Sequence, residues 1–165
     1  MTTLPRSTTL NKRSPLTEED KQIFDQALDL RNAEDLVGAL VLIEELATRH
    51  PTHPSIIGVL AALLWQVGNI ERCVQFARVS VGLSPTSELA SLTLVHALRS
   101  SNREDSALEE VSRFRSIRPS AEYDRLLGEW ENETLQSMIE APLDPIHRKR
   151  LDAVRAELRA RPIRQ

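Results

Sequence analysis

The amino-acid sequence predicts an all-α fold: a right-handed solenoid of three helix–turn–helix repeats with a C-terminal capping helix and a further terminal helix. Two observations support this prediction. First, the 165 residues are 41% hydrophobic but only 4% aromatic, with five glycines, a composition that favours helices over sheets. Second, the chain repeats itself every 34 residues. A period of this length is typical of arrays in which each helical hairpin buries its apolar face against its neighbours.

The 34-residue period is visible in three columns of residues. Prolines recur at its ends, small residues recur twelve positions before them, and polar or turn-forming residues recur seventeen positions before them. The columns are Pro51, Pro85 and Pro119; Ala39, Cys73 and Ala107; and Glu34, Gly68 and Asn102. Because a bulky side chain would hold apart two closely crossing helices, we expect the small residues to be buried where the helices of each hairpin cross.

Within the repeats the apolar residues follow helical spacing. Between Ile57 and Leu64 they recur at i, i+3, i+4 and i+7, which places them on one face of a helix. Asn69 follows a turn and is expected to cap the next helix, and Asn102 is expected to do the same in the third repeat. Thr17 and Asp20 have the spacing of a capping box. Each repeat is therefore predicted to contain two helices.

These columns resemble those of tetratricopeptide-repeat proteins, with repeats over 20–53, 54–87 and 88–121. In the second repeat the family's packing positions hold Leu60, Ala61, Leu64, Gly68, Cys73 and Pro85. Departures from the family pattern include Ser91, where an aromatic residue is usual, and Val95, where glycine or alanine is usual. The resemblance implies a solenoid that binds other proteins, but such a fold serves many partners.

The repeat domain, over 17–140, is predicted to be flanked by two basic segments. Residues 1–16 contain three basic residues and no acid, and we expect them to be a disordered tail. Residues 122–140 are predicted to form the capping helix. Residues 144–160 are predicted to form a basic helix, with Asp144 as its N-cap. This helix could pack on the acidic repeats, pair with another copy of the chain, or lie on a partner.

Charge and hydropathy argue against two classes of partner. The overall net charge is −3, and the basic ends leave a strongly acidic body, whereas nucleic-acid phosphates need a basic face. No apolar run approaches the roughly 20 residues that span a bilayer, and the N-terminus lacks the apolar segment of a secretory signal. We therefore expect a cytoplasmic protein with no nucleic-acid or membrane partner.

The sequence contains no catalytic signature, and we expect neither an enzyme nor a cofactor. His50 and His53 are the one pair of histidines with metal-ligand spacing, but no cysteine or carboxylate accompanies them at suitable spacing, so no metal is expected. Cys73, the single cysteine, excludes an internal disulfide and belongs to the small packing column.

The resemblance also implies where a partner would bind, because in this family the first helix of each repeat lines a concave groove. The corresponding residues are Phe24, Leu28 and Arg31; Gly58, Ala62 and Trp65; and Leu92, His96 and Arg99. Trp65 is the expected anchor, and the small Gly58 and Ala62 leave room for a ligand backbone. Family members that grip the C-terminal carboxylate of heat-shock chaperones carry a Lys/Asn/Arg clamp where this chain has Phe24, Leu28 and Gly58, so that role is not expected.

The predicted function is that of a non-catalytic adaptor or scaffold that holds a peptide or helix of another protein in the groove. One alternative is a bacterial secretion-chaperone-like or immunity-type binder, which the size and number of repeats suggest. Another is a structural subunit that self-assembles, for example as a homodimer, through its basic end and acidic body. A third possibility is that the chain's own ends cover the groove.

Overall fold

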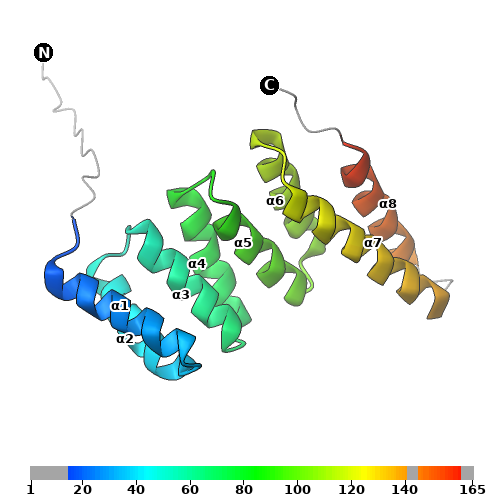
Figure 1. The fold of residues 1–165 in the computed structure, drawn as a ribbon. Helices are drawn as coiled ribbons and strands as arrows, with labels where there is room; N and C mark the ends of the chain where they lie inside the picture. The colour runs from blue at the N-terminus through cyan, green and yellow to red at the C-terminus, as the bar shows by residue number, and fades with distance from the viewer. Residues whose placement is uncertain (1–14, 141–144, 161–165) are drawn as a thin grey trace, which may run out of the picture.

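The computed structural model describes residues 15–140 and 145–160. The described residues form eight α-helices and no strand (Figure 1). The helices are α1 (Glu18–Asn32), α2 (Leu36–Arg49), α3 (Pro54–Gln66), α4 (Ile70–Leu83), α5 (Glu88–Ser100), α6 (Glu104–Ile117), α7 (Ala121–Glu140) and α8 (Pro145–Arg159).

Consecutive helices pair as hairpins that follow one another in a row from α1 to α8 (Figure 1). The pairs are α1 with α2, α3 with α4, α5 with α6, and α7 with α8. The second helix of a hairpin also packs against the first helix of the next, as α2 does on α3 and α4 on α5. The predicted all-α solenoid is therefore confirmed. The capping helix and the terminal helix together make a fourth hairpin.

The small residues of the repeat lie at the helix crossings, as predicted. Ala39, Cys73 and Ala107 are each 0% exposed. In the second repeat the two helices approach so closely that the Cys73 thiol lies 3.2 Å from the Ala61 carbonyl oxygen. A larger side chain in this column would force the helices apart. The repeating prolines, Pro51, Pro85 and Pro119, are exposed in the turns between hairpins.

The turn inside each repeat contains one residue in the left-handed conformation. The φ angle of this residue is 65° at Glu34, 78° at Gly68 and 57° at Asn102. The backbone conformation therefore repeats every 34 residues, as the sequence does. Asn69 caps α4, as predicted, by accepting a hydrogen bond from a backbone N–H in its first turn. The prediction that Asn102 caps α6 is wrong. Asn102 occupies the left-handed position, and the cap residue is Arg103, whose side chain makes no capping hydrogen bond.

The N-terminal end of the described chain begins with a capped helix. The Thr17 hydroxyl accepts a 3.1 Å hydrogen bond from the Asp20 N–H, and the Asp20 carboxylate accepts one from the Thr17 N–H, so the predicted capping box is present. Leu16 packs at the edge of the core. Residues 1–14 of the predicted tail, and Asp144, the predicted cap of α8, lie outside the described residues.

The helix α8 packs on its own chain, which is one of the three arrangements that the sequence left open. It contacts α7 and α6 and buries Leu151 and Val154. The nearly buried Arg115 of α6 donates hydrogen bonds to the carbonyl oxygens of Glu157 (2.5 Å) and Ala160 (3.4 Å). A cation at the C-terminal end of a helix also interacts favourably with the helix dipole. Arg115 therefore fixes the end of α8 to the third repeat.

The helix α7 is joined to the third repeat through a buried polar network. The hydroxyl of Ser91 on α5 lies 2.6 Å from that of Tyr123 on α7 and donates a hydrogen bond to Glu110 on α6. Arg113 in turn pairs with both oxygens of Glu110 at 2.7 Å. Burial raises the pKa of the Tyr123 phenol, which keeps it protonated and able to donate. The small Ser91, which departs from the family pattern, makes room for this contact.

Candidate binding groove

The first helices of the repeats supply the predicted groove residues. Phe24 and Leu92 are partly buried and pack against the core, and Leu28 is partly buried. The helices α3 and α5 contact each other directly, and Arg31 of α1 is hydrogen-bonded to Gln66 of α3. The predicted residues of the second and third repeats therefore lie on neighbouring helices, and Arg31 faces them from α1.

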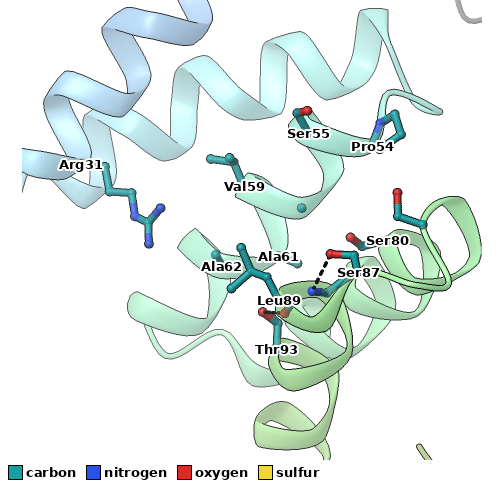
Figure 2. A pocket seen from close by; sticks show the side chains of 13 residues that line it. Arg31, Pro54, Ser55, Val59, Ala61, Ala62, Ser80, Ser87, Leu89 and Thr93 are labelled. Atoms are coloured by element: carbon teal, nitrogen blue, oxygen red, sulfur yellow. Dashed lines mark hydrogen bonds between the residues drawn. The ribbon is translucent and has the colours of Figure 1, made fainter. Parts of the chain in front are cut away.

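A pocket of about 340 Å³ opens between α3 and α5 (Figure 2). Its floor includes the almost fully buried Ala61 and Ser80, whereas Leu89 at its edge is 73% exposed. The pocket is lined by Arg31, Pro54, Ser55, Gly58, Val59, Ala61, Ala62, Ser80, Ser84, Ser87, Leu89, Ala90 and Thr93. Of the predicted site residues it brings together Arg31, Gly58 and Ala62. The other six lie outside it.

Arg31 reaches across from α1 to the pocket (Figure 2). Its Nε donates a 2.9 Å hydrogen bond to the side-chain oxygen of Gln66, at the end of α3. Among the residues that the structure describes, no carboxylate forms an ion pair with Arg31. The remaining guanidinium donors can therefore serve an acceptor on a bound molecule.

Trp65, the predicted anchor, packs beside His96. The two ring centroids are 5.9 Å apart and the rings are inclined by 42°. Burial lowers the pKa of His96, and the positive charges of Arg99 and Arg125 lower it further, which favours a neutral imidazole beside the indole. The Trp65 ring is thus only partly available to a ligand.

Arg99 is held by the fourth hairpin, an arrangement that the sequence did not reveal. Its guanidinium lies 4.3 Å from the centroid of the Trp130 ring and 2.5 Å from a Glu133 carboxylate oxygen. Trp130 is itself 1% exposed. The helix α7 therefore lies beside Arg99, a predicted groove residue of the third repeat, which binds it through Trp130 and Glu133.

The sequence-based selection missed Ser80, which lines the pocket from α4, because the family's rule considers only the first helix of each repeat. The same rule does place Leu89 on the concave surface, where it is the most exposed apolar side chain lining the pocket. Comparing all columns of the three repeats, rather than the groove columns alone, would have revealed Ser80 as the one small polar residue in its column.

The structure offers no metal site among the residues it describes. The His50 ring instead lies 2.9 Å from the Asp20 carboxylate. Burial raises the pKa of the Cys73 thiol to about 11, so this cysteine is an inert packing residue. Within the described helices, none is long and apolar enough to cross a membrane.

No protein-family model matches the chain, and no curated protein matches it. Solved structures do. MamA from Desulfovibrio magneticus RS-1 has a TM-score of 0.59 at 16% identity, over 86% of each chain. The Sgt2 TPR domain from Aspergillus fumigatus has a TM-score of 0.58 at 13% identity, over 89% of this chain and 83% of that one. The Yersinia enterocolitica type III secretion translocator chaperone SycD has a TM-score of 0.58 at 9% identity, over 88% of this chain and 98% of that one. Likeness at these identities concerns the fold, and together with the repeat columns it shows that this chain has the tetratricopeptide-repeat fold.

Proposed function

We propose that this protein is a non-catalytic adaptor that binds a segment of another protein, an extended peptide or a helix, along α1, α3 and α5. The observation that carries the proposal is the pocket of about 340 Å³ that opens between α3 and α5. It includes the predicted groove residues Arg31, Gly58 and Ala62, and its walls are mostly apolar, as is usual for sites that accept a ligand side chain.

Two features at the edge of the pocket support binding of a polypeptide. Leu89 exposes 73% of its surface, and covering it would remove apolar area from water. Arg31 also lines the pocket, from α1, and a backbone carbonyl or an acidic side chain could accept hydrogen bonds from its guanidinium. Apolar contact and directed hydrogen bonds would thus act on the same ligand.

The composition of the pocket argues against catalysis. Of the thirteen residues that line it, Arg31 is the single ionisable one. General acid–base or nucleophilic chemistry needs a second group within hydrogen-bond reach of the first. The lining instead offers shape, apolar surface and hydroxyl groups, which are sufficient for recognition.

A random peptide library selected on the intact protein tests the proposal. Selected peptides should bind the wild-type protein and lose at least about tenfold in affinity to Leu89→Glu, because a charge would then face their apolar side chains. Val79→Glu is the matched control, since Val79 is 45% exposed on α4 and does not line the pocket. Failure to select any binder, or equal binding to both variants, would contradict the groove as the binding site.

A further inference from the structure

The pocket exists because the second repeat has small residues where its two neighbours have large ones. One column of the first helices holds Phe24, Gly58 and Leu92, and the column one turn further along holds Leu28, Ala62 and His96. In both columns the large residues flank the small one. Two side chains that line the groove in the other repeats are therefore missing in the second.

A third column, in the second helices, shows the same substitution. It holds Leu46, Ser80 and Phe114, and both Leu46 and Phe114 are 0% exposed. Gly58 and Ser80 face each other, since a Cβ atom on Gly58 would lie 3.5 Å from the Ser80 hydroxyl oxygen. The three small residues therefore leave one shared space rather than three separate ones.

Protein interiors are normally packed as closely as organic crystals. In the first and third repeats the corresponding positions hold larger side chains, Phe24 and Leu46 in the first and Leu92 and Phe114 in the third. All four pack in or against the hydrophobic core. In the second repeat the space is open to the groove and measures about 340 Å³. Because the surrounding scaffold is the same, the space has the size and apolar walls that suit a large side chain supplied from outside.

The floor of the pocket contains a hydroxyl group that has no partner among the described residues. Ser80 is 3% exposed, and its hydroxyl forms no hydrogen bond with any other residue that the structure describes. Because Ser80 lines the pocket, a molecule that enters the pocket can reach its hydroxyl. Among the other hydroxyls of the lining, Ser87 caps α5 and Thr93 donates to the Leu89 carbonyl. Ser55 and Ser84 form no side-chain hydrogen bond with the described residues either, but they are less buried than Ser80. The Ser80 hydroxyl is therefore available to a ligand that reaches the floor.

We propose that the pocket receives one aromatic side chain that carries a hydroxyl group, a tyrosine of the bound segment; this inference rests on the proposed function. The ring lies between the walls formed by α3 and α5, beside Ala62 and Leu89. Its hydroxyl bonds to that of Ser80. A phenylalanine or leucine would fill the apolar volume but would leave the Ser80 hydroxyl unpaired, which makes a polar tip the better match.

Small molecules that mimic the two side chains test the pocket without a partner. Amide NMR spectra of the intact protein are recorded during titration with p-cresol, the tyrosine side chain, and with toluene, the phenylalanine side chain. We expect saturable shifts at Gly58 and Ala62, with p-cresol binding about fivefold more tightly because of the added hydrogen bond. Absence of saturable shifts, or equal affinity for the two probes, would overturn the inference.

Two substitutions at the pocket floor locate the interaction. Ser80→Ala should make the affinities for p-cresol and toluene equal, and Ser80→Leu, which restores the column, should abolish binding of both. Ser100→Leu, at an exposed position near the end of α5, should leave both titrations unchanged. If Ser80→Leu unfolds the protein, the comparison of p-cresol and toluene affinities in Ser80→Ala still tests whether Ser80 makes the hydroxyl contact. Persistence of the fivefold preference in Ser80→Ala would assign the hydroxyl contact elsewhere and refute the proposal.

The outcomes separate this inference from the adaptor function. Peptides that bind and are lost in Leu89→Glu, together with no pocket binding by p-cresol, would leave the adaptor standing and overturn the tyrosine pocket. Specific p-cresol binding, together with no selectable peptide, would overturn the adaptor function and with it the tyrosine of a bound segment, and would leave only a pocket that accepts a hydroxylated ring. If both hold, the selected peptides should share a tyrosine whose replacement by phenylalanine weakens binding about fivefold.

Discussion

Replacement of Glu34 by glycine is expected to stabilise the solenoid. Glu34 adopts a φ of 65° in the turn between α1 and α2, where the Cβ atom of an L-residue lies too close to the following carbonyl oxygen. The side chain is exposed and makes no hydrogen bond or ion pair with the other described residues. Its removal therefore relieves strain without breaking a contact. The corresponding residue of the second repeat is already a glycine, Gly68.

The size of the effect follows from two opposing contributions. A left-handed conformation costs a non-glycine residue about 1–2 kcal/mol. Glycine, in turn, makes the unfolded chain more flexible, which lowers the free energy of unfolding by about 0.4–1 kcal/mol. The net gain is about 0.5–1 kcal/mol, and for a chain of this length it should raise the melting temperature by about 2–3 °C.

Thermal unfolding followed by circular dichroism measures this gain. Glu34→Ala is the matched control, because it removes the same side chain but keeps the Cβ atom, and it should not raise the melting temperature comparably. Gly68→Ala places a Cβ at a φ of 78° and should destabilise the protein by about 1 kcal/mol. If Glu34→Gly melts no higher than Glu34→Ala, strain at this turn is not what limits stability, and the reasoning is refuted.

Three further predictions concern the packing and the polar contacts. Ala107→Trp should lower stability by about 1–3 kcal/mol, because Ala107 is 0% exposed at a helix crossing; an unchanged melting temperature would contradict the repeat register. Tyr123→Phe should cost about 1 kcal/mol and should speed amide hydrogen exchange in α7 and α8 first, whereas a uniform effect along the chain would show that the phenol does not hold the fourth hairpin. Hydrogen bonds from Thr17, then His50, lower the pKa of Asp20. A lowered carboxyl pKa contributes stability above the ordinary value of 3.8, and this stability is lost as the pH falls below that value. Asp20→Asn should therefore reduce the loss of stability at low pH when the free energy of unfolding is measured against pH. An unaltered pH dependence would show that Asp20 does not cause this loss.

Much of the fold follows from local features of the sequence. The 34-residue period predicts the hairpins, since helical spacing and turn residues act over a few positions and recur in each repeat. Ala39, Cys73 and Ala107 are buried for the reason that their size suggests. The wrong prediction that Asn102 is a helix cap shows where a local sequence pattern is ambiguous. Asparagine suits both a cap and a left-handed turn, and only the backbone geometry distinguishes the two roles.

The sequence by itself determined the solenoid, its register and the set of helices from which a groove can be built, because these depend on spacings that recur along the chain. Only the tertiary structure decided how the ends and the groove are used. It packs α8 on α6 through Arg115 and engages Arg99 with Trp130 and Glu133. It also brings Gly58 of α3 opposite Ser80 of α4 and so opens the pocket. These contacts join residues that are 22 to 42 positions apart, and no local period specifies them. They depend on which side chains fill the space between stacked helices, and that is settled only when the helices are packed together.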